Sequence, residues 1–427
     1  KFTDILGGIE KSVGSTTGAI LILLMIGALS GSWMISGVVP AMIYYGLQIL
    51  NPEIFLPATA IICALVSVST GSSWGTTATV GIALVGIGKA LGVSEAIVAG
   101  AVISGAYFGD KISPLSDTTN LAPAMAGTDL FTHIRYMMLT TVPSFTLALL
   151  LFVVIGLNLD ASGEVSNVQP ILTELDAMFN LTPWLFVVPA LVIGLIVAKM
   201  PALPAILIGT LAGGLFAYIF QQDMLLSFAG TEILDWKSTY EVLMNSFTVD
   251  MAYSAEHPIL VELLGSSGMS GMMDTIWLII AAMTFGGAME ACGFLAAISS
   301  ALLTLAKGTA SLIATTAGTC IFVNVSAADQ YLAIVVPGRM YADAYRKQGL
   351  APENLSRTLE DSGTVTSVLI PWNTCGAYQS GVLGVDTMAY LPYAFFNYIS
   401  PIMTLIFAIF NIKIKRLFTA SPEPQVA

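Results

Sequence analysis

The chain has 427 residues, of which 56% are hydrophobic and only 10% are charged, and its mean hydropathy is +0.83. Soluble domains carry about 25% charged residues, and a net charge of −12 argues against a nucleic-acid partner. The composition predicts an all-α polytopic membrane protein, because a membrane β-barrel would show alternating segments of about ten residues instead.

Long apolar runs predict the membrane spans. Residues 1–17 are polar enough for an amphipathic lead-in, and 18–50 is too long for one comfortable span. Glycines inside 18–50 therefore predict a broken helix or a tight helix pair. The other predicted spans are 54–69, 132–159, 183–199, 202–220, 274–306, 309–336 and 389–411, with shorter apolar runs at 80–88 and 96–108.

Basic loops remain in the cytoplasm, which orients part of the chain. Lys199, the segment 339–357 and the C-terminus are then inside. The acidic loop 161–182, just after Asp160, and the polar segment 221–272 are then outside.

An internal repeat divides the chain. Leu21–Gly37 resembles Trp277–Gly293, and further matches follow at an offset of about 250 residues. Two halves with matched broken helices are typical of secondary transporters. We expect a first repeat at 1–160, the external loop at 161–182, a second repeat at 183–412 that includes 221–272, and a cytoplasmic tail at 413–427. The second half has two helices (183–220) without counterparts before Leu21, so we expect about two further helices in the native first half.

Small, hydroxylic and acidic residues interrupt the spans at four places, and these breaks are the predicted ion site. Hard cations such as Na⁺ take oxygen ligands, and irregular backbone at membrane depth is tolerated where it lines a cavity. The candidate Na⁺ ligands are Thr70, Ser72, Ser73 and Thr76 at the first break; Asp110, Ser113, Asp117 and Thr118 at the second; Asn324, Ser326 and Asp329 at the third; and Asp361, Asn373 and Thr374 at the fourth.

The candidate proton carriers are Asp110, Asp117, Glu290 and Asp361. Burial raises the pKa of a carboxyl and a nearby cation lowers it, so one carboxylate can hold Na⁺ or H⁺ in turn. Structural alternatives stay open: Asp110 as an ion pair with Lys111, Asp361 at the membrane interface, and Glu290 as a protonated structural acid. The four cysteines lack a Cys-x-x-Cys pair and are interpreted as buried side chains, so no metal centre or cofactor is expected.

Four stretches resemble the NhaC-type Na⁺/H⁺ antiporter family: GSSWGTTATVG, SGAYFGDKISPLSDTTNLAP, NVSAADQYLAIVVPGRMY and SRTLEDSGTVTSVLIPWNTCGAY. The resemblance covers about residues 1–415. It implies a bacterial plasma-membrane protein of the inverted-repeat ion-transporter superfamily, with an elevator-like fold. It also implies Na⁺-coupled exchange, although one branch of that family exchanges malate and protons for lactate and Na⁺.

The leading hypothesis is Na⁺/H⁺ antiport by a protein that is not an enzyme, with Asp117 as a direct ligand. The alternative is exchange of a small carboxylate coupled to the same ions, with Lys111 or a half-helix N-terminus as the anion's partner. A remote alternative is an intramembrane aspartyl protease, although Asp110 follows Phe108-Gly109 rather than Gly-x-Gly. The expected partners are membrane lipid and Na⁺, and a homodimer is left open.

Overall fold

The computed structural model describes residues 2–159 and 168–417. Within these ranges the regular elements are helices, and the β pairing consists of two isolated bridges, Met251 with Ser266 and Leu350 with Arg416. The prediction of an all-α protein is confirmed. Asp160 and Glu164, together with the tail beyond Leu417, lie outside the described residues.

The first described range holds α1 (Phe2–Ser15), α2 (Thr17–Ile35), α3 (Val38–Ile49), α4 (Pro52–Thr70), α5 (Ser73–Thr76), the π turn η1 (Thr77–Gly81), α6 (Ile82–Ala90), α7 (Glu95–Ile112), α8 (Asp117–Ala126) and α9 (Leu130–Asn158). The second holds α10 (Gln169–Met178), η2 (Pro183–Phe186), α11 (Val187–Val197), α12 (Ala202–Phe220), α13 (Gln222–Ala229), α14 (Trp236–Thr248), α15 (Pro258–Leu263), η3 (Gly268–Met272), α16 (Met273–Ala291), α17 (Phe294–Leu303), α18 (Thr309–Ser326), α19 (Gln330–Lys347), α20 (Pro352–Leu359), the π turn η4 (Glu360–Thr364), η5 (Ser367–Leu369), α21 (Thr374–Leu383), α22 (Thr387–Tyr390), η6 (Leu391–Tyr393) and α23 (Phe395–Ile409).

Several of these helices can cross a membrane. By length and composition there are six in the described part of the chain, or up to eight if two bent helix pairs each count as one span. One bent pair joins Gln169–Met178 to Pro183–Val197 at 87°. The segment 161–182 is therefore no simple loop, because part of it folds as α10. The prediction of a polytopic membrane protein is confirmed.

The expected broken helix over 18–50 is present, and its counterpart breaks in the same way. Gly37 separates α2 from α3 with φ +77°, and Gly293 separates α16 from α17 with φ +75°. Only glycine adopts this left-handed conformation without steric cost, so both breaks are set by the sequence. These are the two glycines that the repeat alignment pairs.

The four other predicted breaks are also present. The helices stop at Gly71–Ser72, at 113–116, at 327–329 and at 370–373. Each lies inside the range in which the sequence predicts it (70–77, 110–118, 319–329 and 361–374), but the helix continues through Thr319 and through Asp361. At Thr319 the hydroxyl donates to the Thr315 carbonyl at 2.8 Å, so a hydroxyl-rich stretch remains helical there.

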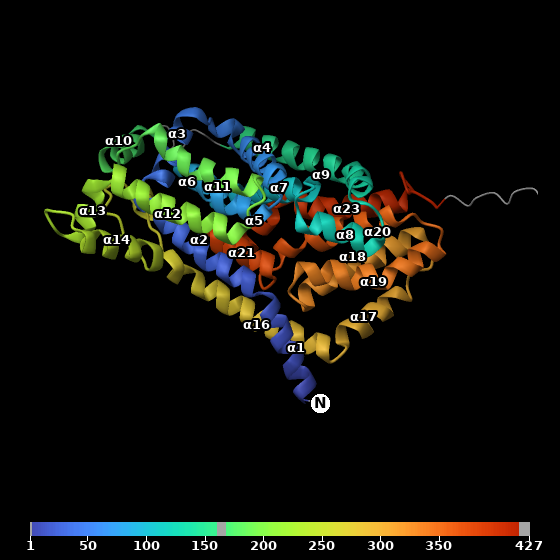
Figure 1. Ribbon diagram of the computed structural model, residues 1–427. Coiled ribbons are helices and arrows are strands. Elements are labelled where there is room, and N and C mark those ends of the chain that lie inside the picture. Colours follow the sequence, from blue (N-terminus) through green and yellow to red (C-terminus); the bar gives the residue numbers. More distant parts are fainter. Residues whose placement is uncertain (1, 160–167, 418–427) are drawn as a thin grey trace, which may run out of the picture.

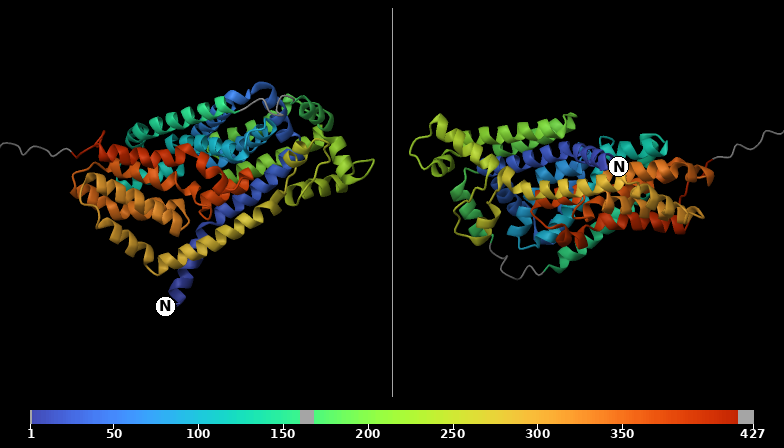
Figure 2. Two further views of the ribbon diagram at one scale, coloured as in Figure 1. Left: turned by 180° about the vertical axis from the view of Figure 1, so that it is seen from behind. Right: turned by 90° about the horizontal axis from the view of Figure 1, so that it is seen from below.

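Figure 1 shows α2 and α16 running side by side in opposite directions. Figure 2 shows α1 projecting beyond the body of the molecule. It packs on α16 closely: a Cβ on Gly8 would lie 2.6 Å from the Ala291 Cβ. The opposite directions of α2 and α16 are those expected of inverted repeats, and the repeat itself stays a prediction.

Candidate functional site

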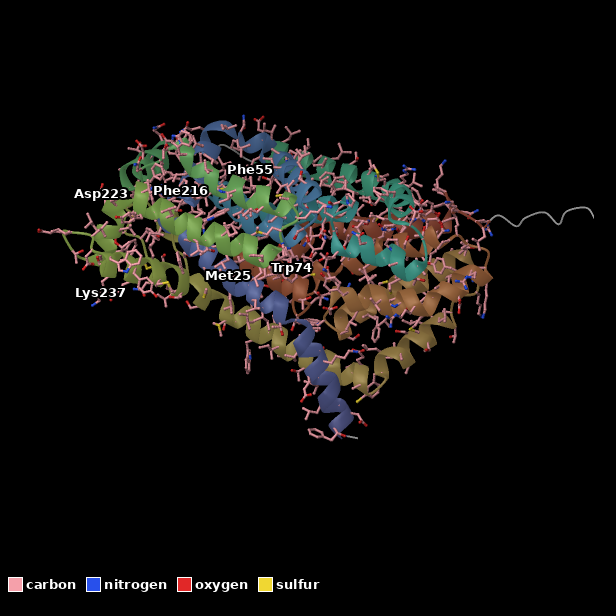
Figure 3. All side chains as sticks on the ribbon, in the orientation of Figure 1. Met25, Phe55, Trp74, Phe216, Asp223 and Lys237 are labelled. Atoms are coloured by element: carbon pink, nitrogen blue, oxygen red, sulfur yellow. The ribbon has the colours of Figure 1, made fainter. Side chains whose placement is uncertain are left out.

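A cavity of about 570 Å³ lies where all four helix breaks meet. Figure 3 shows Trp74, one of its wall residues, in the middle of the molecule, far from Asp223 and Lys237 at one end. The polar and aromatic lining includes Lys11, Ser72, Ser73, Trp74, Asp110, Ser116, Asp117, Thr118, Glu290, Asp329, Gln330, Tyr331, Thr374 and Tyr378. Eight of these are predicted site residues: Ser72, Ser73, Asp110, Asp117, Thr118, Glu290, Asp329 and Thr374.

Gly71 brings the first two breaks into contact. It adopts φ +69°, and a Cβ there would lie 2.6 Å from the Leu115 Cβ and 2.9 Å from the Ser116 nitrogen. The chain then enters α5 with the Ser72 hydroxyl accepting from the Gly75 N–H at 3.0 Å. A glycine is therefore required here by both the backbone conformation and the close approach.

Asp110 and Asp117 differ in environment although both line the cavity. Asp110 is largely buried at the end of α7, and the Ser73 hydroxyl donates to its Oδ2 at 2.6 Å. Asp117 begins α8 and is exposed. Its neighbour Ser116 caps that helix by accepting from the Thr119 N–H at 3.4 Å. The first half thus offers one buried and one accessible carboxylate.

The third and fourth breaks are joined in a similar way. Ala328 has φ +59°, and its carbonyl accepts from the Thr374 N–H at 2.9 Å. Asp329 caps α19 by accepting from the Leu332 N–H at 2.9 Å, and its largely buried side chain lines the cavity. Thr374 begins α21 on the same wall. The second half thus adds a third carboxylate.

Glu290 of α16 supplies the fourth carboxylate, and Lys11 of α1 is the one basic side chain among the described lining residues. Both side chains are exposed. The walls therefore hold four acids against one cation.

Seven predicted ligands lie outside this lining: Thr70, Thr76, Ser113, Asn324, Ser326, Asp361 and Asn373. Most of their polar atoms bond to the protein itself. Thr76 donates to the Ser72 carbonyl at 2.9 Å, Ser113 to the Val68 carbonyl at 2.8 Å, and Ser326 to the Phe322 carbonyl at 2.7 Å.

Asn324 and Asn373 connect the third break to the fourth by hydrogen bonds, and neither residue lines the cavity. The Asn373 amide donates to the Asn324 backbone carbonyl and to its Oδ1, each at 3.1 Å. The Asn324 amide donates in turn to the Gly363 carbonyl at 2.6 Å. Both side chains are fully buried, so they act as supports for the breaks.

Asp361 lies in a second, buried polar cluster. It forms an ion pair with Lys111, and both side chains are inaccessible to solvent. Its Oδ2 accepts from Thr140 at 2.8 Å, and Ser400 donates to its Oδ1 at 3.1 Å. One structural alternative is therefore wrong, because Lys111 pairs with Asp361 and not with Asp110. Asp361 is buried within the protein, and its place at the membrane interface stays a prediction. Adjacent residues of α7 point in different directions, which separates Asp110 from Lys111.

Sequence reasoning missed Gln330, Lys11 and the aromatic residues of the wall. The Trp74 and Tyr378 rings stack with centroids 3.8 Å apart, and the Tyr378 hydroxyl donates to the Trp74 carbonyl at 3.0 Å. These contacts join the two halves across about 300 residues, a separation at which no local pattern gives a signal. Gln330 follows Asp329 directly, and its place at the start of α19, just after a helix break, was the available signal.

Discontinuous helices, capped by polar side chains and meeting at an acid-lined cavity between membrane spans, define a secondary transporter. A family model described as the Na⁺/H⁺ antiporter family matches residues 105–412. The chain belongs to this family.

The curated relatives that follow are also named as antiporters. The chain is 40% identical to the Na(+)/H(+) antiporter NhaC of Alkalihalophilus pseudofirmus, over 92% of this chain and 82% of the relative. It is 34% identical to the malate-2H(+)/Na(+)-lactate antiporter of Bacillus subtilis, over 95% of this chain and 84% of the relative. It is 35% identical to the arginine/ornithine antiporter ArcD of Halobacterium salinarum, over 94% of this chain and 81% of the relative.

Proposed function

We propose that this protein exchanges Na⁺ for H⁺ across the bacterial plasma membrane, with both ions using the carboxylates of the central cavity. The observation that carries the proposal is the meeting of Asp110, Asp117, Glu290 and Asp329 in one cavity. Like charges close together at membrane depth are costly, so they favour the arrival of a cation or the uptake of a proton.

The proposed Na⁺ ligands are oxygen atoms of the cavity lining. Asp110 with the Ser73 hydroxyl is a largely buried oxygen pair, and Asp117, Thr118 and Thr374 add oxygens from the starts of α8 and α21. Hard cations prefer such oxygens. Protonation of a carboxylate removes the charge that holds Na⁺, and Na⁺ in turn favours the ionised carboxyl. Alternate occupation of one set of oxygens is sufficient for exchange.

The proposed orientation follows the basic segments. Lys199, the segment 339–357 and the C-terminus face the cytoplasm, and 221–272 faces the outside. The family's name supports Na⁺ and H⁺ as the transported ions, with no cofactor required.

Malate/lactate exchange is the second candidate, and it draws support from the printed name of one relative. An organic dianion would need a positive partner in the cavity. Lys111 is already paired with Asp361, which leaves Lys11 as the basic residue of the described lining. Four carboxylates around the space oppose an anion.

A flux assay in proteoliposomes separates the two candidates. With chloride as the only anion, a Na⁺ gradient should drive proton movement that a pH-sensitive dye inside the vesicles records. Proton movement that appears only with malate and lactate on opposite sides would establish the second candidate. Absence of flux under both conditions would overturn both.

A further inference from the structure

We infer that the end of the molecule formed by α19 and the segment after α23 binds the headgroups of anionic phospholipids in the membrane that the protein spans. Figure 1 shows α19 and α23 at the end opposite α13 and α14. Six exposed basic side chains gather there and are called the basic patch: Lys307, Arg346, Lys347, Lys413, Lys415 and Arg416.

Hydrogen bonds assemble the basic patch from three separate parts of the chain. The Leu417 N–H, beyond α23, donates to the Gly349 carbonyl, just after α19, at 2.8 Å. The Gln348 side chain donates to the Ala306 carbonyl at 3.5 Å, which brings in the turn that carries Lys307. The patch is therefore one surface, although its members lie more than 100 residues apart in the sequence.

The segment after α23 is held in place although its backbone conformation is unusual. Asn411 and Lys413 have φ angles of +53° and +51°, which residues other than glycine rarely adopt. The Tyr136 hydroxyl donates to the Lys413 carbonyl at 2.7 Å, and the Asn354 amide donates to the Lys415 carbonyl at 2.6 Å. The side chains of Tyr136 and Asn354 are buried. The protein therefore fixes the backbone from which these exposed basic side chains extend.

Most of the charge of the basic patch is uncompensated. Arg346 pairs with Asp343 at 3.3 Å, and Lys415 pairs with the largely buried Glu353. The other four basic side chains form no ion pair with any described residue. Six positive charges against two negative ones leave an excess of four, in a chain whose net charge is −12. A cluster of this size next to a membrane span attracts anionic headgroups.

Exposed apolar side chains beside the patch favour a lipid surface over a free anion. Ile409 and Phe410 are 67% and 71% exposed, and Leu417, next to Arg416, is 42% exposed. They follow the bent helix pair that ends at Ile409 and can cross a membrane, so the patch begins where a span ends. At that level basic side chains meet phosphates and apolar side chains meet acyl chains. A free phosphate ion would leave the apolar side chains without a partner.

The test is thermal unfolding of the purified full chain in dodecyl maltoside. The separate additives are phosphatidylglycerol, phosphatidylcholine, inorganic phosphate and polyglutamate, with the three anions compared at equal charge. A ligand that binds the folded state raises the unfolding temperature as its concentration increases. We expect the largest rise with phosphatidylglycerol, and we expect added salt to reduce it because ions screen exposed charges.

Charge-neutralising variants locate the binding surface. Lys347→Gln should require about fivefold more phosphatidylglycerol for the same rise, and Lys347→Gln combined with Arg416→Gln about 25-fold more. Lys237→Gln removes the same charge at the opposite end of the molecule (Figure 3), so this control should respond as the wild type does. Without lipid, all three variants should unfold near the wild-type temperature, because the replaced side chains are exposed.

Four results would overturn the inference. An equal rise with phosphatidylcholine would show that acyl chains alone are sufficient. An equal rise with phosphate would assign the patch to a free anion, and an equal rise with polyglutamate would assign it to an acidic protein. An unchanged response in the double variant would place the lipid elsewhere. The proposed ion exchange is measured by flux and does not depend on any of these outcomes.

Discussion

At the scale of single residues, α7 divides its two charges between two environments. Asp110 faces the cavity and bonds to Ser73, whereas Lys111 is buried against Asp361. An ion pair between neighbouring residues was a reasonable interpretation of the sequence. The structure instead separates Asp110, which lines the cavity, from the buried Lys111–Asp361 pair, and the two clusters call for different experiments.

Asp117 is the accessible carboxylate at the start of α8, and Asp117→Asn should abolish Na⁺-dependent proton flux. The amide keeps the shape of the side chain but cannot ionise. It therefore offers no negative charge to Na⁺ and no carboxylate that can take up a proton. Because Asp117 is exposed, the unfolding temperature should remain near that of the wild type. Asp250→Asn, at an exposed acid in the polar segment, is the control and should retain flux. Wild-type Na⁺ affinity in Asp117→Asn would move the site toward Asp329 and Asp110.

The Lys111–Asp361 pair should matter for stability. Asp361→Asn leaves a buried ammonium without its counter-charge, which costs about 3–5 kcal/mol of unfolding free energy. Adding Lys111→Met removes that charge and should restore a large part of the loss. Thermal unfolding in detergent measures both variants. A wild-type unfolding temperature in Asp361→Asn alone would show that the pair is not a structural ion pair.

At the scale of elements, the helix breaks depend on particular backbone conformations. Gly71→Ala should destabilise the protein and reduce transport, since alanine costs about 1–2 kcal/mol in the left-handed conformation. Its Cβ would also lie 2.6 Å from the Leu115 Cβ, which is a steric clash. Gly318→Ala is the control within α18, because a Cβ there has no atom within 4 Å among the described residues. Equal unfolding temperatures and flux for the two variants would contradict this role of Gly71.

The positions of the breaks were largely predictable, because they depend on local chemistry. Glycine at 37 and 71 and proline at 114 disfavour a helix whatever surrounds them. Hydroxyl content alone was a weaker guide. Thr319 and Ser326 bond to carbonyls four residues earlier and remain helical, so the third break begins later than the composition indicated. The helix α10 was missed because a short acidic segment resembles a loop.

At the scale of the whole molecule, the class of protein could be predicted, whereas long-range partners could not. Mean hydropathy and span length indicated a polytopic membrane protein, and the quoted motifs indicated its family. The contacts of Lys111 with Asp361 and of Trp74 with Tyr378 join segments about 250–300 residues apart. Such pairs follow from helix packing, which no local pattern encodes. The division into two inverted repeats stays a prediction, with α2 and α16 running in the directions it requires.

The central claim is that the same carboxylates hold Na⁺ and H⁺ in turn. Isothermal titration of Na⁺ into the purified protein, in two buffers that differ in ionisation enthalpy, measures the protons exchanged on binding. Na⁺ binding should release protons, and Asp117→Asn should reduce that release together with Na⁺ affinity. Na⁺ binding without proton release at every pH from roughly 6 to 9 would contradict the account, because the same carboxylates would then not exchange one ion for the other.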